Sequence, residues 1–224
     1  MGGRGVGVSS DPGAGAPSLA AGSRLRAQLE FVLEADRLKH VLRQSLLTNG
    51  SRHENDAEHS WHLALMAVVL AEYGPPGLDL GRAMQMLIVH DLVEIDAGDS
   101  FIYDEAALAT KAEREQAAAR RIFGLLPPDQ GQRFAALWEE FEARESPDAR
   151  FAAAMDRLEP LLLNFQTGGA TWRPNGIRRG QVVARNGPSL AEGAPDLWAF
   201  AERMIDEAVA RGYLGADFVG GGET

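Results

Sequence analysis

The chain has 224 residues, 45% hydrophobic content and a formal charge of −10 at pH 7, a size and composition that suit one globular domain with a sizeable core. It contains no cysteine, which excludes a disulfide framework and a thiolate metal site. The negative charge disfavours a nucleic-acid polymer as partner, because binding to one depends on Lys and Arg neutralising its phosphates. Small phosphorylated molecules remain compatible with this charge.

Residues 1–22 consist mainly of Gly, Ala, Ser and Pro and show no periodic apolar pattern. This composition predicts a disordered leader. No charged segment followed by an apolar stretch resembles a signal peptide, and the chain has no run of about 18 apolar residues to span a membrane. We therefore expect a cytoplasmic protein without membrane association.

From Ser23 onward, the apolar residues recur with helical spacing, and no alternating strand pattern competes with it. The sequence predicts an all-α fold, with one helical bundle over residues 23–214 and a flexible C-terminal tail over residues 215–224. The expected helices cover residues 24–35, 36–47, 57–73, 79–96, 104–124, 127–144, 147–167 and 190–212.

A histidine and two acids interrupt the apolar run of residues 83–95, namely His90, Asp91 and Glu94. Their spacing of three and four residues places them near one face of a helix. Burying such groups without compensation costs roughly 2–7 kcal/mol for a polar group and more for a charge. A divalent metal ion is the simplest compensation. The alternative is a His–Asp pair that satisfies itself within the core.

Two further polar residues occupy helical settings. His59 lies in the first turn of an expected helix, since Asn55 and Glu58 have the spacing of a capping box. Taken alone, His59 is also compatible with a capping or surface role. Asp156 lies within an apolar helical stretch, where the alternative to a site role is an ion pair with the adjacent Arg157.

Together these residues resemble the H…HD…D motif of the HD-domain metal-dependent phosphohydrolases. The resemblance extends over residues 35–168, and residues 90–99 are similar to those of the bacterial 5′-deoxynucleotidases and their uncharacterised relatives. It implies a homodimer and one divalent metal ion per site. A set of nitrogen and oxygen donors favours Mn, Co, Ni or Fe over Zn or Mg. The implied ligands are His59, His90, Asp91 and Asp156.

The same resemblance implies roles for three more residues. Glu94 and Asp99 match catalytic acids, and Glu94, one turn beyond the HD pair, suits orienting water or exchanging a proton with it. Arg43 matches an arginine expected to bind the substrate phosphate. In the deoxynucleotidases a tryptophan associated with the sugar follows that arginine, whereas this chain has Gln44. A strong preference for deoxyribose is therefore not expected.

Residues 160–191 contain no Asp or Glu but several arginines, in surroundings rich in Gly and Asn. We interpret it as a mobile loop able to cover a phosphate, because guanidinium groups match phosphate oxygens. The alternatives are a solvated connector or a dimer contact. The arginines concerned are Arg173, Arg178, Arg179 and Arg185.

The expected function is metal-dependent release of phosphate from nucleoside 5′-monophosphates by an activated water molecule. One alternative keeps the chemistry but changes the substrate to a nucleoside triphosphate or another small phosphorylated metabolite. Another is a non-catalytic metal-stabilised scaffold or regulatory module. A di-iron oxygenase of the same fold would require additional histidines, and only His40, His53 and His62 remain.

Overall fold

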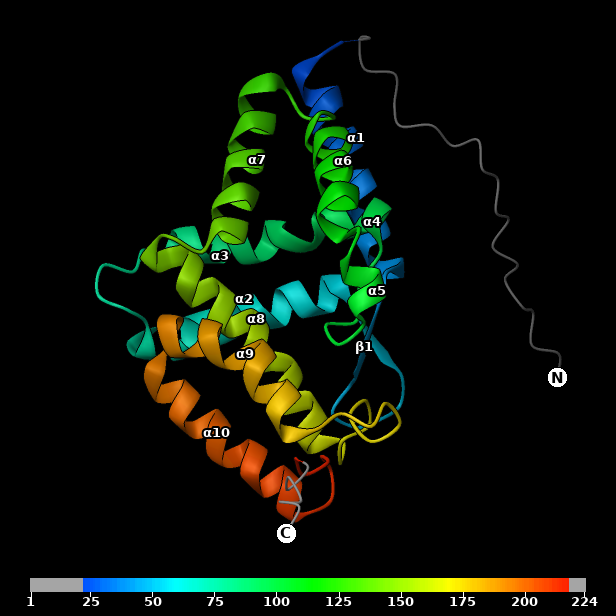
Figure 1. Cartoon of the computed structure of the whole chain (residues 1–224). Coiled ribbons are helices and arrows are strands. Elements are labelled where there is room, and N and C mark those ends of the chain that lie inside the picture. Colours follow the sequence, from blue (N-terminus) through cyan, green and yellow to red (C-terminus); the bar gives the residue numbers. More distant parts are fainter. Residues whose placement is uncertain (1–21, 218–224) are drawn as a thin grey trace, which may run out of the picture.

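The computed structural model describes residues 22–217. Residues 1–21 of the expected leader and residues 218–224 of the expected tail lie outside this range. The prediction of an all-α fold is confirmed, with one small hairpin added to the helices (Figure 1). No helix within the described part of the chain is both long and apolar enough to cross a membrane.

The α-helices are α1 (Arg24–Ala35), α2 (Asp56–Leu70), α3 (Leu80–Val89), α4 (Glu94–Ala97), α5 (Glu105–Leu108), α6 (Lys111–Phe123), α7 (Pro128–Ala143), α8 (Pro147–Gln166), α9 (Arg179–Gly193) and α10 (Pro195–Ala210). Three short 3-10 helices are η1 (Asp36–His40), η2 (Ala71–Tyr73) and η3 (His90–Val93), and the strands are β1 (Leu42–Leu46) and β2 (His53–Asn55).

Two apolar clusters stabilise these elements. The larger cluster joins α2, α3, α8, α9 and α10, and the smaller one joins α1, α6, η3 and part of α7. In Figure 1, α8, α9 and α10 lie side by side at one end of the molecule, whereas α1, α6 and α7 form the other end. Helix α3 contacts α2, α7 and α8, so its C-terminal end lies where the two clusters meet.

The prediction of a helix over residues 36–47 is wrong. The chain forms η1 and then β1, which pairs antiparallel with β2. On β1 the inward positions belong to polar residues, Arg43 and Ser45, while Leu42 is 59% exposed. A strand normally shows apolar residues on its buried face. Here the buried face borders a polar cavity, so the usual alternation is inverted and the pattern was not recognisable as a strand.

The interpretation of residues 160–191 as a mobile loop is also wrong for most of its length, since α8 continues to Gln166 and α9 begins at Arg179. The glycines and Pro188 of α9 argue against a helix locally. Packing explains two of the glycines. A Cβ added to Gly187 would lie 3.1 Å from the ring of Trp198 in α10. A Cβ at Gly193 would collide with the backbone of Arg150 in α8. Small residues therefore allow α9 to pack closely between its neighbours.

Of the expected C-terminal tail, residues 215–217 are described and contact the start of α9. Gly215 forms a parallel bridge with Arg178, whose side chain donates a hydrogen bond of 2.7 Å to the carbonyl of Ala216. The backbone N–H of Gly180 donates to Oδ1 of Asp217 at 2.7 Å. These contacts satisfy donors at a helix N-terminus, which has no intrahelical acceptors for its first N–H groups.

Candidate active site

The HD pair lies in a 3-10 segment between two α-helical segments. The expected helix over residues 79–96 is interrupted, because α3 ends at Val89 and η3 covers His90 to Val93. Leu87 packs in the larger apolar cluster, whereas Leu92 packs in the smaller one. Apolar residues before and after the HD pair thus join different clusters, which places the polar pair between the two.

The backbone fixes the orientation of the His90 ring. Its Nδ1 lies 2.9 Å from the carbonyl oxygen of Leu87, which can only accept a hydrogen bond. Nδ1 therefore carries the proton, and Nε2 faces Oδ1 of Asp91 at 3.1 Å. The Nε2 atom is buried and has no hydrogen-bond donor or acceptor partner.

His59 reaches the same place from α2, whose first turn is held by the predicted capping box: Asn55 accepts from the Glu58 N–H, and Glu58 accepts from the Asn55 N–H. The ring of His59 is fully buried, and its centroid lies 5.8 Å from that of His90. Asp156 on α8 brings Oδ1 to 3.2 Å from His59 Nε2 and 3.9 Å from His90 Nε2. The structure thus brings together all four residues expected to be metal ligands.

This donor set fits a divalent metal ion. One ligand atom each from His59, His90 and Asp91 lies within 4.8 Å of the others, and Asp156 approaches both imidazoles. Burial raises the pKa of Asp91, but the neighbouring His90 and Arg43 lower it below its usual value. Burial likewise raises the pKa of Asp156. The charges of Arg157 and the two histidines outweigh this effect and hold that pKa well below its usual value. Both carboxyl groups are therefore ionised and available to a cation.

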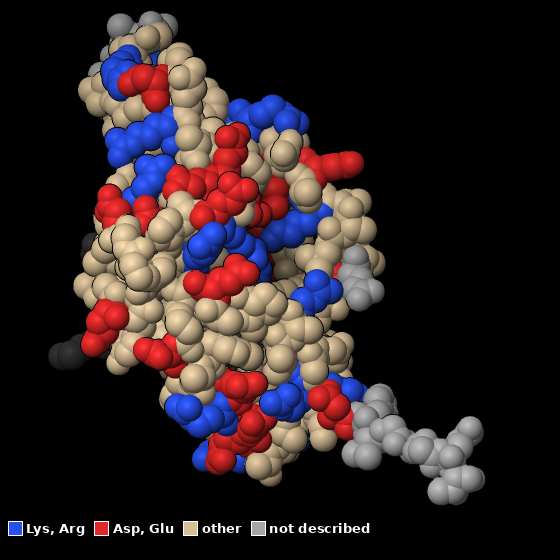
Figure 2. All heavy atoms as spheres, turned by 60° about the vertical axis from the view of Figure 1, so that its left-hand side comes forward, with Lys and Arg blue, Asp and Glu red and all other residues tan. Residues whose placement is uncertain are grey.

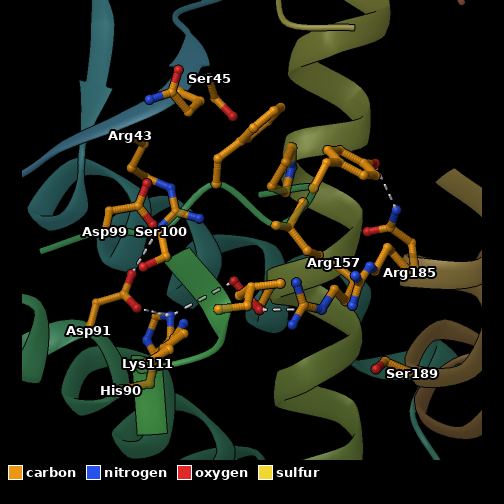
Figure 3. Close-up of a pocket in the computed structure, with 18 of the residues that line it drawn as sticks. Arg43, Ser45, His90, Asp91, Asp99, Ser100, Lys111, Arg157, Arg185 and Ser189 are labelled. Carbon is orange, nitrogen blue, oxygen red and sulfur yellow. Dashed lines mark hydrogen bonds and ion pairs between the residues drawn. The ribbon is translucent and has the colours of Figure 1, made fainter. Parts of the chain in front are cut away.

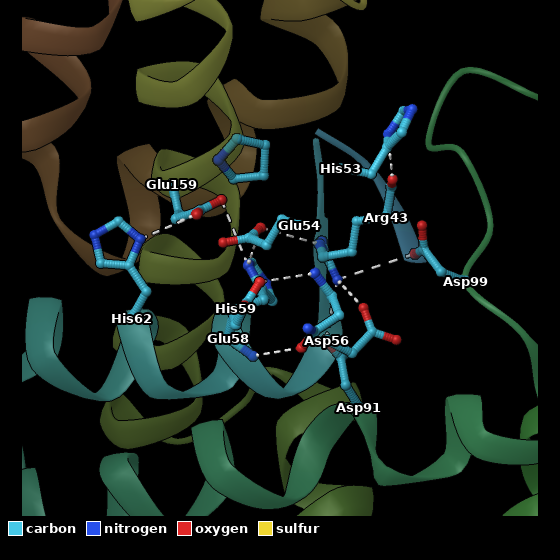
Figure 4. A network of polar contacts seen from close by, with 12 residues as sticks. Arg43, His53, Glu54, Asp56, Glu58, His59, His62, Asp91, Asp99 and Glu159 are labelled. Atoms are coloured by element: carbon cyan, nitrogen blue, oxygen red, sulfur yellow. Dashed lines mark hydrogen bonds and ion pairs between the residues drawn. The ribbon is translucent and has the colours of Figure 1, made fainter. Parts of the chain in front are cut away.

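Arg43 extends from β1 into a group of carboxylates (Figure 4). Its Nη1 donates to Oδ2 of Asp91 at 3.0 Å and to Oδ1 of Asp56 at 3.1 Å, and Asp99 lies at 4.0 Å. Burial and then the charge of Asp91 raise the pKa of the Asp56 carboxyl to about 7, against the lowering effect of Arg43. The guanidinium favours the ionised forms of Asp56 and Asp91. It borders the same cavity as His90.

Glu94 and Asp99 follow the HD pair and also face the cavity. Glu94 is 3% exposed, and its Oε1 lies 3.5 Å from Nζ of Lys111 on α6. Burial and then the charge of Asp91 raise the pKa of Glu94 to about 9. Gly98 ends α4 with a φ of 74°, a conformation that glycine adopts without strain, and Asp99 thereby turns toward Arg43. Its pKa is raised, mainly by burial.

The cavity has a volume of about 610 Å³ and opens beside these residues (Figure 3). Phe101, Tyr103 and Trp172 contribute aromatic side chains to its wall. The remaining cationic side chains of the wall are Lys111, Arg144, Arg157 and Arg185. Figure 2 shows that basic and acidic side chains are closely intermixed over one face of the molecule.

Only one arginine of the predicted basic segment borders the cavity, Arg185 on α9. Arg179 instead pairs with Asp206 of α10 at 2.7 Å, and Arg178 contacts the C-terminal segment. Sequence reasoning missed Lys111 and Arg144 because each lies in an ordinary polar helical stretch. It also missed Asp56, because an acid in the first turn of a helix is common at exposed positions.

Three more polar residues adjoin His59 on the side away from the cavity, namely the buried Glu54 on β2 and Glu159 on α8 and the half-buried His62 on α2 (Figure 4). Nδ1 of His62 lies 3.1 Å from Oε1 of Glu159. The spacing of three residues between His59 and His62, and between Asp156 and Glu159, is the signal that could have indicated this second group, since it places each pair on one helix face.

Comparisons with known proteins agree with this arrangement. The HD domain family model matches residues 35–198. A human protein named 5′-deoxynucleotidase HDDC2 is 32% identical over 142 residues, covering 63% of this chain and 68% of the human one. The Schizosaccharomyces pombe 5′-deoxynucleotidase hdd1 is 24% identical over 135 residues, covering 58% of this chain and 67% of its own length.

A solved structure from Magnetospirillum magnetotacticum, described as a predicted metal-dependent phosphohydrolase, is 58% identical. It superposes with a TM-score of 0.82 and covers 86% of this chain and 96% of its own. The residues that the family model matches include His59, the HD pair and Asp156. The chain therefore belongs to the HD domain family and is an enzyme of the phosphohydrolase type.

Proposed function

We propose that the enzyme releases phosphate from nucleoside 5′-monophosphates by attack of water. The observation that carries the proposal is the assembly of four candidate metal ligands beside Arg43, with Glu94 and Asp99 at the same cavity. The cavity of about 610 Å³ lies within the usual range for a small-molecule site, and its aromatic wall suits a nucleobase. Relatives named 5′-deoxynucleotidase support this substrate class.

The ligands in this proposal are His59, His90, Asp91 and Asp156. A divalent ion held there supplies Lewis acidity toward a phosphoryl oxygen and lowers the pKa of bound water. Arg43 binds the phosphate through charge-assisted hydrogen bonds, for which its fixed fork of donors is suited. Glu94 and Asp99 hold and move the protons of the reacting water and the leaving group. No side chain needs to act as a covalent nucleophile.

A phosphate-release screen tests the substrate class. The panel contains 5′-monophosphates, 3′-monophosphates, nucleoside triphosphates and sugar phosphates, each assayed with Mn²⁺, Co²⁺, Mg²⁺ and Zn²⁺. We expect 5′-monophosphates to exceed the other classes by at least about tenfold in kcat/KM, a difference of about 1.4 kcal/mol. Preferential release from triphosphates would assign the alternative substrate. A negative result with every substrate and metal would favour a scaffold.

The sugar preference provides a second test. Gln44 borders the cavity next to Arg43, and its amide can hydrogen-bond a hydroxyl group. We expect AMP and dAMP to be hydrolysed with kcat/KM values within about tenfold of each other, a gap of less than about 1.4 kcal/mol. Gln44→Trp should shift this ratio toward dAMP. A strong preference of the wild type for dAMP would show that sugar discrimination lies elsewhere in the cavity.

We further propose that the enzyme is a homodimer, associating through α2. The exposed side of this helix carries an apolar stripe at helical spacing, formed by Trp61, Leu65, Val68 and Val69, with exposures of 66%, 46%, 50% and 63%. Such a contiguous apolar face favours contact with a second copy.

Val69→Glu should convert the dimer to a monomer in light-scattering measurements. Leu33→Glu, at a 62% exposed position on α1, is the matched control and should leave the mass unchanged; the reverse result would place the interface on α1.

A further inference from the structure

The two histidines of the candidate metal centre are held in different ways. His90 donates its Nδ1 proton to a backbone carbonyl, that of Leu87. His59 has no such partner: its Nδ1 faces Oε2 of Glu159 at 3.4 Å and Oε2 of Glu54 at 3.6 Å. These three atoms are all buried and have no hydrogen-bond partner at normal distance. Buried polar atoms in such positions require a partner.

The chemistry of a metal-bound imidazole supplies that partner. When Nε2 gives its lone pair to a cation, the other ring nitrogen carries the proton. In His59 this proton would lie at Nδ1, whose nearest acceptors are the two carboxylates. Metal-binding histidines commonly donate this second N–H to a carboxylate, which fixes the tautomer and the ring orientation and increases the basicity of the ligand.

Each of the two glutamates also faces a basic side chain besides His59. Glu159, which is fully buried, accepts from His62 at 3.1 Å, and this hydrogen bond raises the pKa of His62. Glu54, 2% exposed, has Nε of Arg43 at 3.8 Å. Glu159 thus uses Oε1 for His62 and leaves Oε2 toward His59, whereas Oε2 of Glu54 faces both Arg43 and His59.

We propose that Glu159 and Glu54 are positioning residues that accept the Nδ1 proton of His59 and thereby present its Nε2 to the metal ion. Glu54 lies between His59 and Arg43 and faces both. We infer that it fixes the metal ligand and the arginine at the cavity relative to one another. The inference rests on the metal centre of the proposed function but not on its substrate. It is therefore testable by metal binding and spectroscopy without any assay of turnover.

The first measurement uses the wild-type protein. In long-range ¹H–¹⁵N spectra of the Zn²⁺-loaded protein labelled with ¹⁵N-histidine, His59 should be the Nδ1–H tautomer, with a slowly exchanging Nδ1 proton. Observation of the Nε2–H tautomer would overturn the proposal. This result needs no substitution, so it does not depend on the folding of any variant.

The second measurement is the affinity for Mn²⁺, determined by competition with a chelator. Glu159→Gln and Glu54→Gln should each weaken binding by about 10–100-fold, the range found for residues that orient metal ligands. If the proposed hydrolysis is observed, kcat at saturating Mn²⁺ should change by less than about threefold. Thermal unfolding of the metal-free variants verifies that the isosteric changes preserve the fold.

Glu58→Gln is the matched control, because Glu58 adjoins His59 in sequence but pairs with Arg52 and the Asn55 backbone; its Mn²⁺ affinity should equal that of the wild type. Unchanged affinity in both Glu159→Gln and Glu54→Gln would contradict the proposal. The proposal would also be overturned if the wild type bound a second equivalent of Mn²⁺ and His62→Gln abolished that binding. The group of Glu54, His62 and Glu159 would then be a separate cation site. Failure to hydrolyse nucleotides would leave all these readouts intact.

Discussion

Glu94→Gln is expected to lower kcat for nucleoside 5′-monophosphates at least about 100-fold while the fold and the bound metal are retained. Glu94 is buried at the cavity, and burial together with Asp91 raises its pKa to about 9. The carboxyl can therefore hold a proton at neutral pH and exchange it with water or a leaving group. The amide of glutamine preserves the shape of the side chain but cannot make this exchange.

The measurement is kcat at saturating Mn²⁺, accompanied by metal analysis of the same sample. Glu115→Gln is the control, because Glu115 also pairs with Lys111, at 3.0 Å, but has no role in the proposed proton transfer. We expect less than about a threefold change for Glu115→Gln, well below the effect of a lost acid or base. Unchanged kcat in a metal-replete Glu94→Gln protein would assign Glu94 to packing and pairing with Lys111.

Arg43→Ala is expected to lower kcat/KM for every phosphorylated substrate alike, by an amount equivalent to a loss of roughly 2–4 kcal/mol of transition-state stabilisation. The reason is that it removes charge-assisted hydrogen bonds to the phosphate. Arg43→Lys should recover only part of the loss, since lysine lacks the bidentate fork. The structure adds a second consequence. Nη1 also donates to Asp56 and Asp91, so the alanine variant leaves two buried carboxylates without this donor.

Kinetics at increasing Mn²⁺ separate these two effects. If Arg43 binds phosphate, the loss in kcat/KM persists when the metal centre is saturated. If activity returns fully at high Mn²⁺, Arg43 acts through Asp91 and the phosphate role is contradicted. Arg52→Ala provides the control, because Arg52 is exposed beside the same hairpin and pairs with Glu58; its activity should match that of the wild type.

The sequence was most informative where a polar residue interrupted an apolar pattern. His90 and Asp91 stand out in the helical run for that reason, and they do lie buried between two apolar clusters. The capping box at Asn55 located the start of α2 and hence His59. Both inferences depend on local patterns of a few residues. The distances that bring Asp156 to the two histidines depend on α8 packing against α2 and α3.

The missed features depend on tertiary structure. The inward face of β1 is polar because it borders the cavity, so the expected apolar alternation is lacking. Helix α9 contains Gly187 and Gly193 because it packs closely against α10 and α8, which outweighs the unfavourable local propensity. The contact of Glu54 with His59 joins β2 to α2 across a bend of the chain, and a regular helical or strand period does not encode such a contact.

The most direct test of the central claim is phosphate release from AMP and dAMP, followed while Mn²⁺ is titrated into chelator-treated protein and bound metal is measured in parallel. We predict negligible release without metal and a rate that rises in proportion to the occupancy of the site. His90→Ala, which removes one expected ligand, should bind Mn²⁺ poorly and remain inactive. Full phosphate release by the metal-free protein, or metal-saturated protein that releases no phosphate from either nucleotide, would contradict the account.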